Sequence, residues 1–275
     1  MSLNELLSGY GFKFNKKFGQ NFISDKNLLE AIVKDSKISN DDIVIEIGAG
    51  AGTLTAQLCA QAKKVIAFEI DANLKPILSE TLSGYTNYEI IYEDALKCTK
   101  ERIQLLTNDC QFKVVANLPY YITTPIIMKF IEEEYKAQSL TVMVQYEVAK
   151  RLTAEANTVD YGAITVAIDF VSDAVITRKV NRQMFYPAPN VDSAVVYIPI
   201  NRNKYFGKYK ETQRLVKAGF NMRRKTLVNN LIASYAINRS DAEALVIKNG
   251  LDKNIRAEAM TTQQFYDLAK DLSGY

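Results

Sequence analysis

The sequence predicts an α/β protein in which a mostly parallel sheet carries helices on both faces and a small all-helical domain follows. Two observations lead to this prediction. Over the first two thirds of the chain, short apolar runs alternate with segments whose apolar residues have helical spacing, as strands and crossover helices do in a parallel sheet. From about Tyr205 onward only the helical spacing remains. We therefore predict one domain over residues 1–200 and a second over residues 201–275.

The expected strands and helices alternate along the chain. Ile43–Ile47 is a short apolar run that ends at Gly48, which is typical of a buried strand. Val191–Ile200 follows Pro187 and Pro189, which bar helix and central-strand pairing, so we expect antiparallel pairing late in the sheet. The other predicted strands are Val65–Ile70, Tyr88–Tyr92, Phe112–Ala116 and Leu140–Gln145, and the predicted helices are Thr53–Ala62, Ala72–Leu82 and Thr124–Tyr135.

The composition excludes several kinds of chemistry. The chain has 275 residues and no histidine, which removes mechanisms that use imidazole as a base or metal ligand. Cys59, Cys98 and Cys110 form no CxxC pair, so we expect neither a disulfide framework nor a metal site. No apolar run reaches about 18 residues, and the first residues lack the apolar core of a signal peptide. We therefore expect a cytoplasmic protein that does not act at a membrane.

Positive charge is concentrated in one part of the chain. The formal net charge is only +3, but residues 202–225 contain a single acid, Glu211, among many basic residues. Such a segment suits a polyanionic partner, and the alternative is a solvated helix face. The basic residues are Arg202, Lys204, Lys208, Lys210, Arg214, Lys217, Arg223, Arg224 and Lys225.

A glycine-rich loop follows the first predicted strand. The sequence from Glu46 to Gly52 has the pattern ExGxGxG, and a helix is expected from Thr53. Glycines allow a tight turn and a close approach of a ligand to the backbone. The dinucleotide pattern GxGxxG fails because Thr53 stands where its last glycine would be. The loop resembles the first motif of S-adenosylmethionine-dependent methyltransferases, and the Glu46 carboxylate would suit the positive charge of that cofactor. A tight turn without a ligand is the alternative for the loop alone.

Two more acids stand at the ends of the next predicted strands. Glu69 ends the second strand, where a carboxylate can accept hydrogen bonds from both hydroxyls of a ribose. Asp94 closes the third strand, where it can accept a hydrogen bond from the adenine amino group of the cofactor. Each of these acids can be an ordinary strand-end residue. Together with Glu46, however, they are three acids at successive strand ends, and this favours a ligand, because open α/β sheets bind ligands at the carboxyl ends of their strands.

The most specific motif is Asn117-Leu118-Pro119-Tyr120, at the end of the fourth predicted strand. It resembles the [DN]-P-P-[YF] and N-[LI]-P-[YF] motifs of enzymes that methylate exocyclic amines of bases. Asn117 can accept a hydrogen bond from the amine, and Tyr120 offers a flat face for the base. Phe185, before the two prolines, can grip the other face. The alternatives are a strand-to-turn junction with a buried tyrosine and a plain proline-rich connection.

Four motifs together resemble the ribosomal RNA adenine dimethyltransferases, and their order matches that family. They are Lys17–Phe22, Glu46–Gly52, Asn117–Tyr120 and Phe185–Val195. The resemblance implies a Rossmann-like class I methyltransferase sheet with an antiparallel late strand and a small C-terminal helical domain. Val191–Val196 and Phe220–Leu227 are similar to the branch of the family that modifies small-subunit RNA during ribosome assembly.

The resemblance also implies a cofactor, a substrate and residue roles. The cofactor is S-adenosylmethionine, and the substrate is 16S ribosomal RNA in an assembly intermediate of the small subunit, dimethylated on two adjacent adenines of its 3′-terminal hairpin loop. Nothing in the sequence demands more than a monomer. Arg223, Arg224 and Lys225 are expected to contact the RNA backbone. The residues expected at the cofactor are Gln20, Asn21, Ile23, Glu46, Gly48, Gly50, Glu69, Ile70, Asp94, Ala95 and Asn117, and those expected to be catalytic are Asn117, Leu118, Tyr120 and Phe185.

Three alternatives remain at this point. A large-subunit methyltransferase of the macrolide-resistance branch would share the cofactor site and the Asn117–Tyr120 motif. A DNA adenine methyltransferase would use a similar motif, usually with Asp first, and would bring a target-recognition domain that the sequence does not contain. An assembly factor that acts mainly by binding RNA would not need the catalytic residues that this sequence retains.

Overall fold

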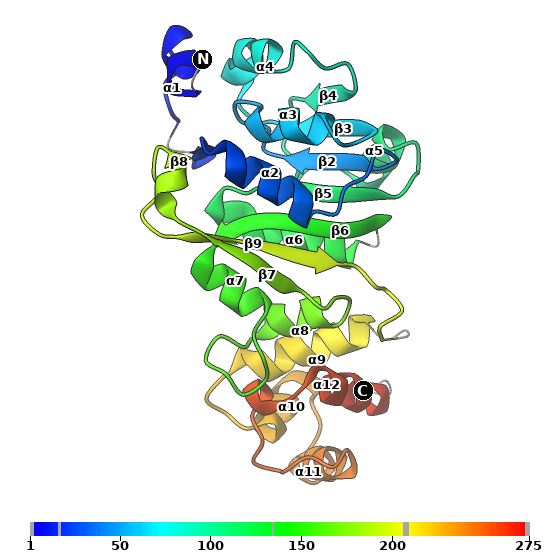
Figure 1. Ribbon diagram of the computed structural model, residues 1–275. Helices are drawn as coiled ribbons and strands as arrows, with labels where there is room; N and C mark the ends of the chain where they lie inside the picture. The colour runs from blue at the N-terminus through cyan, green and yellow to red at the C-terminus, as the bar shows by residue number, and fades with distance from the viewer. Residues whose placement is uncertain (1–2, 16–17, 134, 206–208, 273–275) are drawn as a thin grey trace. The chain divides into compact units, whose positions relative to one another are not determined.

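The computed structural model describes residues 3–15, 18–133, 135–205 and 209–272 (Figure 1). Contacts divide the chain into two compact units, residues 1–149 with 175–200, and residues 150–174 with 201–275. The division differs from the predicted one in that residues 150–174 group with the C-terminal helices, although they precede the last strands of the sheet. We call the two parts the sheet unit and the helical unit.

The sheet unit is built on a seven-stranded sheet with the order β4-β3-β2-β5-β6-β9-β7. The first five strands in this order are parallel, whereas β9 pairs antiparallel with both β6 and β7. The predicted mostly parallel sheet with an antiparallel late strand is therefore confirmed. The strands are β2 (Ile43–Ile47), β3 (Lys64–Phe68), β4 (Tyr88–Ile91), β5 (Phe112–Asn117), β6 (Ala137–Gln145), β7 (Val175–Val180) and β9 (Ser193–Pro199).

Helices cover both faces of the sheet. Figure 1 shows α2 (Lys26–Asp35) and α3 (Thr53–Cys59) in front of the sheet, and α5 (Lys100–Leu106) and α6 (Thr123–Glu132) behind it. The front core joins buried side chains of α2 and α3 to alternate residues of the strands, such as Val65, because successive side chains of a strand point to opposite faces. The unit also contains α1 (Leu3–Gly9), η2 (Ala72–Leu74), α4 (Lys75–Thr81), η3 (Tyr120–Ile122) and most of α7 (Tyr146–Leu152).

A two-stranded ribbon lies beside the main sheet. It pairs β1 (Phe22–Ile23) with β8 (Phe185–Tyr186) in antiparallel orientation. Each strand has two residues, which is too short for any sequence pattern to indicate, and neither strand was predicted. A 3₁₀ turn, η4 (Arg182–Met184), precedes β8. The ribbon brings two of the sequence motifs, which are far apart along the chain, into direct contact.

The helical unit has its own apolar core. Leu215, Leu231 and Phe265 are fully buried in it. The last three α-helices begin at the capping side chains Thr226, Asn238 and Thr261. At the last of these, Thr261 Oγ1 accepts a hydrogen bond from the Gln264 backbone, and the Gln264 side chain accepts one from the Thr261 backbone. The elements are α8 (Ala163–Asp169), α9 (Tyr209–Asn221), α10 (Leu227–Tyr235), α11 (Arg239–Lys248), η5 (Ala257–Ala259) and α12 (Thr262–Asp271).

No helix in the described part of the chain is long and apolar enough to cross a membrane.

Candidate active site

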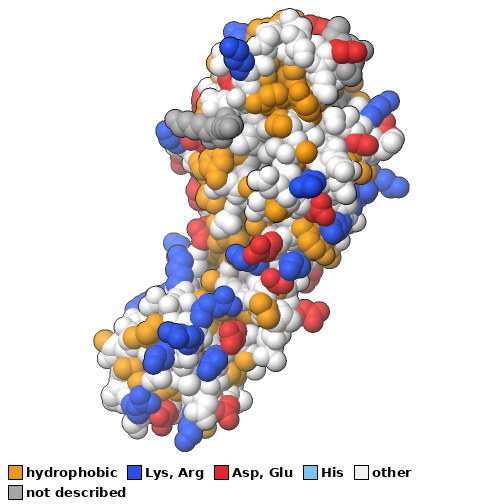
Figure 2. Space-filling view, turned by 90° about the vertical axis from the view of Figure 1, so that its left-hand side faces the viewer, with side chains coloured by type: hydrophobic (Ala, Val, Ile, Leu, Met, Phe, Trp, Pro, Cys, Tyr) orange, Lys and Arg blue, Asp and Glu red, His pale blue; other side chains and the backbone are white. Residues whose placement is uncertain are grey.

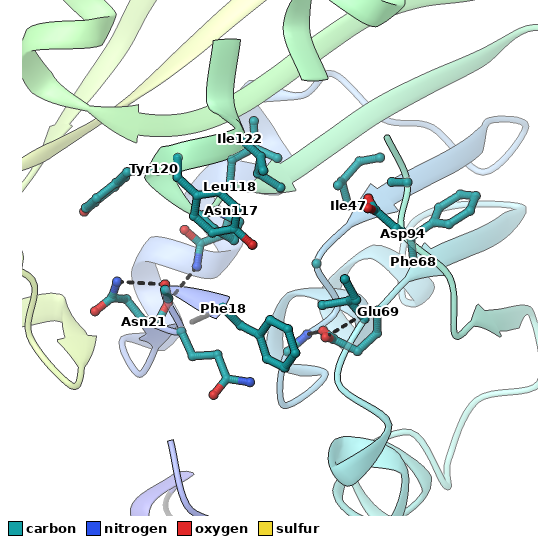
Figure 3. Close-up of a pocket in the computed structure, with 18 of the residues that line it drawn as sticks. Phe18, Asn21, Ile47, Phe68, Glu69, Asp94, Asn117, Leu118, Tyr120 and Ile122 are labelled. Carbon is teal, nitrogen blue, oxygen red and sulfur yellow. Dashed lines mark hydrogen bonds between the residues drawn. The ribbon is translucent and has the colours of Figure 1, made fainter. Parts of the chain in front are cut away.

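A cavity opens at the carboxyl ends of β2, β3 and β5, and it encloses about 980 Å³ when its open mouth is included (Figure 3). The structure brings most of the predicted site residues together here. Among the residues predicted for the cofactor and for catalysis, only Ile23 and Glu46 are missing from its lining. The predicted residues in its lining are Gln20, Asn21, Gly48, Gly50, Glu69, Ile70, Asp94, Ala95, Asn117, Leu118, Tyr120 and Phe185.

The glycine-rich loop forms the floor between β2 and α3. Gly48, Gly50 and Gly52 all have positive φ, in the region that side chains rarely adopt. At Gly50 a Cβ atom would also lie 3.0 Å from the Phe22 ring, so a side chain here would force that ring to shift. The backbone conformation therefore favours glycine at all three positions of the ExGxGxG pattern. Without side chains at these positions, the loop backbone stays open to the cavity.

Glu69 is the acid at the end of β3, and its carboxylate is tied to three backbone N–H groups. Its Oε2 accepts a hydrogen bond from Gly50 at 2.8 Å, and its Oε1 accepts from Ile70 and Asp71, also at 2.8 Å. Burial raises the pKa of the Glu69 carboxyl, the three N–H donors oppose that rise, and the charge of Asp71 adds to it. Since a carboxylate has about four acceptor positions, Oε2 keeps room for one more donor, such as a ribose hydroxyl.

Asp94 lies after β4, and Figure 3 shows it near Ile47 and Phe68 at the opposite side of the cavity from Asn21. Its Oδ1 accepts a hydrogen bond from the Leu96 backbone at 3.0 Å. Within the described residues, Oδ2 accepts none, so this oxygen is available to an amine. Together with Glu69 it gives the cavity two acid side chains at neighbouring strand ends.

Glu46 is positioned differently from its prediction. Its side chain is fully buried in the sheet, and within the described residues neither carboxylate oxygen has a hydrogen-bond partner. Burial raises the pKa of the Glu46 carboxyl to about 8, the nearby Thr55 hydroxyl opposes that rise, and the negative charge of Glu69 adds to it. The side chain is absent from the cavity lining because alternation along β2 directs the neighbouring Ile47, and not Glu46, into the cavity.

The N-terminal segment crosses the cavity from β1. Gln20 Nε2 donates a hydrogen bond to Asp71 Oδ2 at 2.7 Å, and Gln20 Oε1 accepts one from the Asn15 backbone at 2.9 Å. Both the nitrogen and the oxygen of the Gln20 side-chain amide are therefore occupied by hydrogen bonds within the protein. Ile23, one residue beyond the lining, is buried in β1 and pairs with Phe185, so its contribution is to hold the segment.

Asn117 ends β5, and its side-chain amide has a fixed orientation. Nδ2 donates a hydrogen bond to the backbone oxygen of Asn21 at 2.9 Å (Figure 3). Because a carbonyl oxygen can only accept, the amide must face it with its NH₂ group, and Oδ1 must point the other way. No hydrogen bond to Oδ1 exists within the described residues. Asn117 therefore lines the cavity with an acceptor atom that the protein itself does not use, and its predicted role toward an amine substrate stays a prediction.

Two aromatic residues of the prediction share this cavity. Tyr120 begins η3, and its hydroxyl lies 2.9 Å from Ser193 Oγ at the start of β9. Burial raises the pKa of the Tyr120 hydroxyl, and the Ser193 contact partly opposes that rise. Phe185 is buried in β8, with 4% of its surface exposed. The two rings come from segments far apart along the chain, and both line the cavity, as their predicted roles on the two faces of one base require.

The predicted RNA-binding residues lie in the turn between α9 and α10 of the helical unit. Arg223, Arg224 and Lys225 are all exposed, and Arg223 Nη2 donates a hydrogen bond to the Tyr161 backbone oxygen at 3.2 Å. Figure 2 shows Lys and Arg side chains gathered on the visible face of this unit. Part of the basic segment is neutralised internally, since Lys204 contacts two aspartates at 2.7 Å. Lys17 of the first motif and Lys208 of the basic segment lie outside the described residues.

Sequence reasoning missed about half of the cavity lining. Phe18, Gly19 and Phe22 belong to a motif that was recognised, but no individual role was assigned to them. The same holds for Ile47 and Pro119, which lie in the glycine-loop and Asn117–Tyr120 motifs. The remaining residues reach the cavity through turns and strand ends whose geometry the sequence does not reveal. The missed lining residues are Phe18, Gly19, Phe22, Ile47, Phe68, Glu93, Leu96, Pro119, Tyr121 and Ile122.

Comparison with known proteins gives consistent results. The family described as "Ribosomal RNA adenine dimethylase" matches residues 11–273. The chain is 44% identical over 271 residues to the "Ribosomal RNA small subunit methyltransferase A" of Lachnoclostridium phytofermentans, covering 96% of this chain and 93% of that one. It is 41% identical to the protein of the same name from Clostridioides difficile over 264 residues, covering 95% and 91%.

Two solved structures are similar over almost the same extent. A dimethyladenosine transferase from Plasmodium falciparum superposes with a TM-score of 0.77 at 25% identity, covering 92% of this chain and 98% of that one. The 23S rRNA methyltransferase ErmE superposes with a TM-score of 0.70 at 26% identity, covering 92% and 99%.

Proposed function

Because this chain belongs to the ribosomal RNA adenine dimethylase family, we propose that it dimethylates N6 of two adjacent adenines in 16S ribosomal RNA. The target is the 3′-terminal hairpin loop of a small subunit that is still being assembled in the cytoplasm, and the methyl donor is S-adenosylmethionine. One observation carries the proposal: Asn117 lines the same cavity as Glu69, its Nδ2 is held by the Asn21 backbone oxygen, and its Oδ1 accepts no hydrogen bond within the described residues.

The residues present fit the cofactor. Glu69 and Asp94 each keep a free acceptor position for the hydroxyl and amino groups of an adenosine. Gly48 and Gly50 leave the loop backbone open to a ligand, and Gln20 and Asn21 cover the opposite side. S-adenosylmethionine supplies an electrophilic methyl group when it is bound. Glu46 is not part of this set, because it does not reach the cavity.

The chain's own residues position the target amine. The N6 lone pair of adenine is delocalised into the ring, so the amine is a weak nucleophile. Asn117 Oδ1 accepts a hydrogen bond from one N–H, which favours a pyramidal nitrogen and fixes its direction. Tyr120, held by Ser193, offers one flat face to the base, and Phe185 contacts it from another segment. The proton of the methylated nitrogen passes to water, so no histidine is required.

The helical unit would dock on the RNA backbone through Arg223, Arg224 and Lys225. Their exposure and their place directly before the N-terminus of α10 support this, because helix N-termini and cationic side chains both attract phosphate. Contacts of this kind position an enzyme without reading sequence. They also make binding weaken with salt.

The small-subunit branch is favoured over its rivals by the relatives. Proteins named for the small subunit match at 41% and 44% identity, whereas the 23S rRNA methyltransferase matches at 26%. A role in assembly alongside catalysis is compatible with the same site. An Asn117→Ala variant would separate the two roles, because it should lose methyl transfer and still bind the subunit.

The test is transfer of labelled methyl groups from S-adenosylmethionine to small subunits from a strain that lacks this modification. Purified large subunits and DNA serve as parallel substrates. We expect dimethyladenosine in the small subunit alone. Label in large-subunit RNA would move the protein to the other branch, and label in neither RNA would refute the assignment of Asn117 as the acceptor for the amine.

A further inference from the structure

Tyr121 is a feature of the cavity that the proposed function does not use. It follows Tyr120 directly and lines the same cavity, yet 59% of its surface is exposed. Glu69, deep in the cavity, is 6% exposed. Tyr121 therefore lies at the mouth, on the path by which a large substrate must enter.

The two consecutive tyrosines are held in different ways. Tyr120 has its hydroxyl anchored on buried Ser193. Both belong to η3, and since a 3₁₀ helix has three residues per turn, neighbouring side chains point about 120° apart. Within the described residues, the Tyr121 hydroxyl has no hydrogen-bond partner. The exposed ring is thus not explained by a contact inside the protein.

The Tyr121 ring lies next to a glycine of the N-terminal segment. A Cβ atom built on Gly19 would lie 3.7 Å from both Cδ1 and Cε1 of Tyr121 and 3.6 Å from Pro119 Cβ, and Gly19 itself has a φ of +58°. The Tyr121 ring therefore lies beside Gly19, and because glycine has no side chain, nothing from this position covers the ring. With 59% of Tyr121 exposed, the ring is open to a ligand at the mouth of the cavity.

We propose that Tyr121 is a stacking site for the nucleotide next to the target adenine. The inference rests on the proposed function and adds a second base-binding position to it. A base that enters the cavity leaves the stack of its own strand, and its neighbour in the strand remains at the mouth without a stacking partner. Exposed aromatic rings bind such unstacked bases of single-stranded RNA. Tyr121 supplies this ring one residue away from the ring that contacts the target.

The experiment compares Tyr121→Ala, Tyr121→Leu and Tyr121→Phe with the wild-type protein on small subunits that lack the modification. We expect the Ala and Leu variants to lose about tenfold in kcat/KM for the subunit, mainly through a higher KM, and the Phe variant to keep wild-type values. The affinity for S-adenosylmethionine, measured by calorimetry, and Tm should stay unchanged in all three. Leu105→Ala is the control, because Leu105 is 67% exposed on α5 and does not line the cavity.

Three results would overturn the inference while the wild-type protein still methylates the subunit. Full kcat/KM in the Ala variant would mean that the ring binds nothing. A loss in the Phe variant equal to that in the Ala variant would mean that the hydroxyl acts, and not the flat face. Weaker cofactor binding in the Ala variant would assign Tyr121 to the cofactor. If the wild-type protein itself transfers no methyl group to RNA, the proposed function fails, and this inference fails with it.

Discussion

The hydroxyl of Tyr120 and Oγ of Ser193 lie 2.9 Å apart, which joins the Asn117–Tyr120 motif to the first residue of β9. Ser193 is fully buried and pairs with Gln145 across the sheet, so it has no freedom to follow a moving ring. The contact fixes the tilt of the Tyr120 ring through its only polar atom. Two sequence motifs that look independent are therefore parts of one structure.

Replacement of Ser193 by alanine should release the Tyr120 ring. A single hydrogen bond of this kind is worth about 1 kcal/mol, so we expect kcat/KM for the small subunit to fall about fivefold, with unchanged affinity for S-adenosylmethionine. Ser139→Ala is the matched control, because Ser139 is a buried serine of β6 whose hydroxyl has no partner within the described residues. Equal kcat/KM in both variants would show that the Tyr120 ring does not need this anchor.

Replacement of Glu69 by alanine should weaken cofactor binding by about tenfold or more, since hydrogen bonds to a charged group are worth about 1.5–3 kcal/mol. The loss has two sources, the missing acceptor for the ribose and the three backbone N–H groups that lose their partner. Calorimetry with S-adenosylmethionine measures the change. Glu89→Ala, which removes a half-exposed acid of β4 paired with Lys64, should bind the cofactor normally. Equal affinity in the two variants would remove Glu69 from the cofactor site.

Glu46 should make the protein less stable at alkaline pH. Its pKa in the folded state is raised to about 8 from a value of 4.5, so between these values the folded chain binds more protons than the unfolded chain. Stability therefore falls as pH rises through this window. Glu46→Gln cannot ionise, and we expect it to match the wild-type protein near pH 5 and to exceed it by about 2–4 kcal/mol near pH 9. Urea unfolding at both pH values measures this, and a difference independent of pH would contradict it.

Charge reversal of Arg223 and Arg224 together should weaken binding to the small subunit and leave cofactor affinity unchanged. Both side chains are exposed in the turn before α10, where loss of phosphate contacts would also reduce the salt dependence of binding. A control with the same change in net charge reverses Lys63 and Lys75, two exposed lysines of the sheet unit. If methylation of the subunit by the Arg223/Arg224 variant continues at the wild-type rate at physiological salt, this turn does not bind RNA.

The sequence predicted the sheet well because its strands carry strong local signals. The run Ile43–Ile47 is β2 to the residue, and the prolines before Val191 correctly indicated a late antiparallel strand. The strand β7 was missed because its residues are only partly buried and include Arg178 and Lys179, which hide its apolar pattern.

The candidate site was predicted less completely, for a different physical reason. Strand-end residues such as Glu69 and Asn117 were found because the carboxyl edge of a parallel sheet collects them. Glu46 was expected there too, but side chains alternate between the two faces of a strand, so the neighbouring Ile47 lines the cavity and Glu46 does not. Contacts such as Gln20 with Asp71 depend on how the N-terminal segment crosses the sheet, which no local pattern encodes.

The ribbon of β1 and β8 also sets the order in which the protein can become functional during synthesis. Ser24 donates its backbone N–H to Met184, 160 positions later, and β9, which carries Ser193, comes later still. A growing chain on the ribosome can form β2, β3 and β5 early, but it cannot close the walls of the cavity until residues 185–199 have emerged. A nascent chain therefore has no complete methyltransferase site, and these long-range contacts make the cavity one of the last parts of the sheet unit to form.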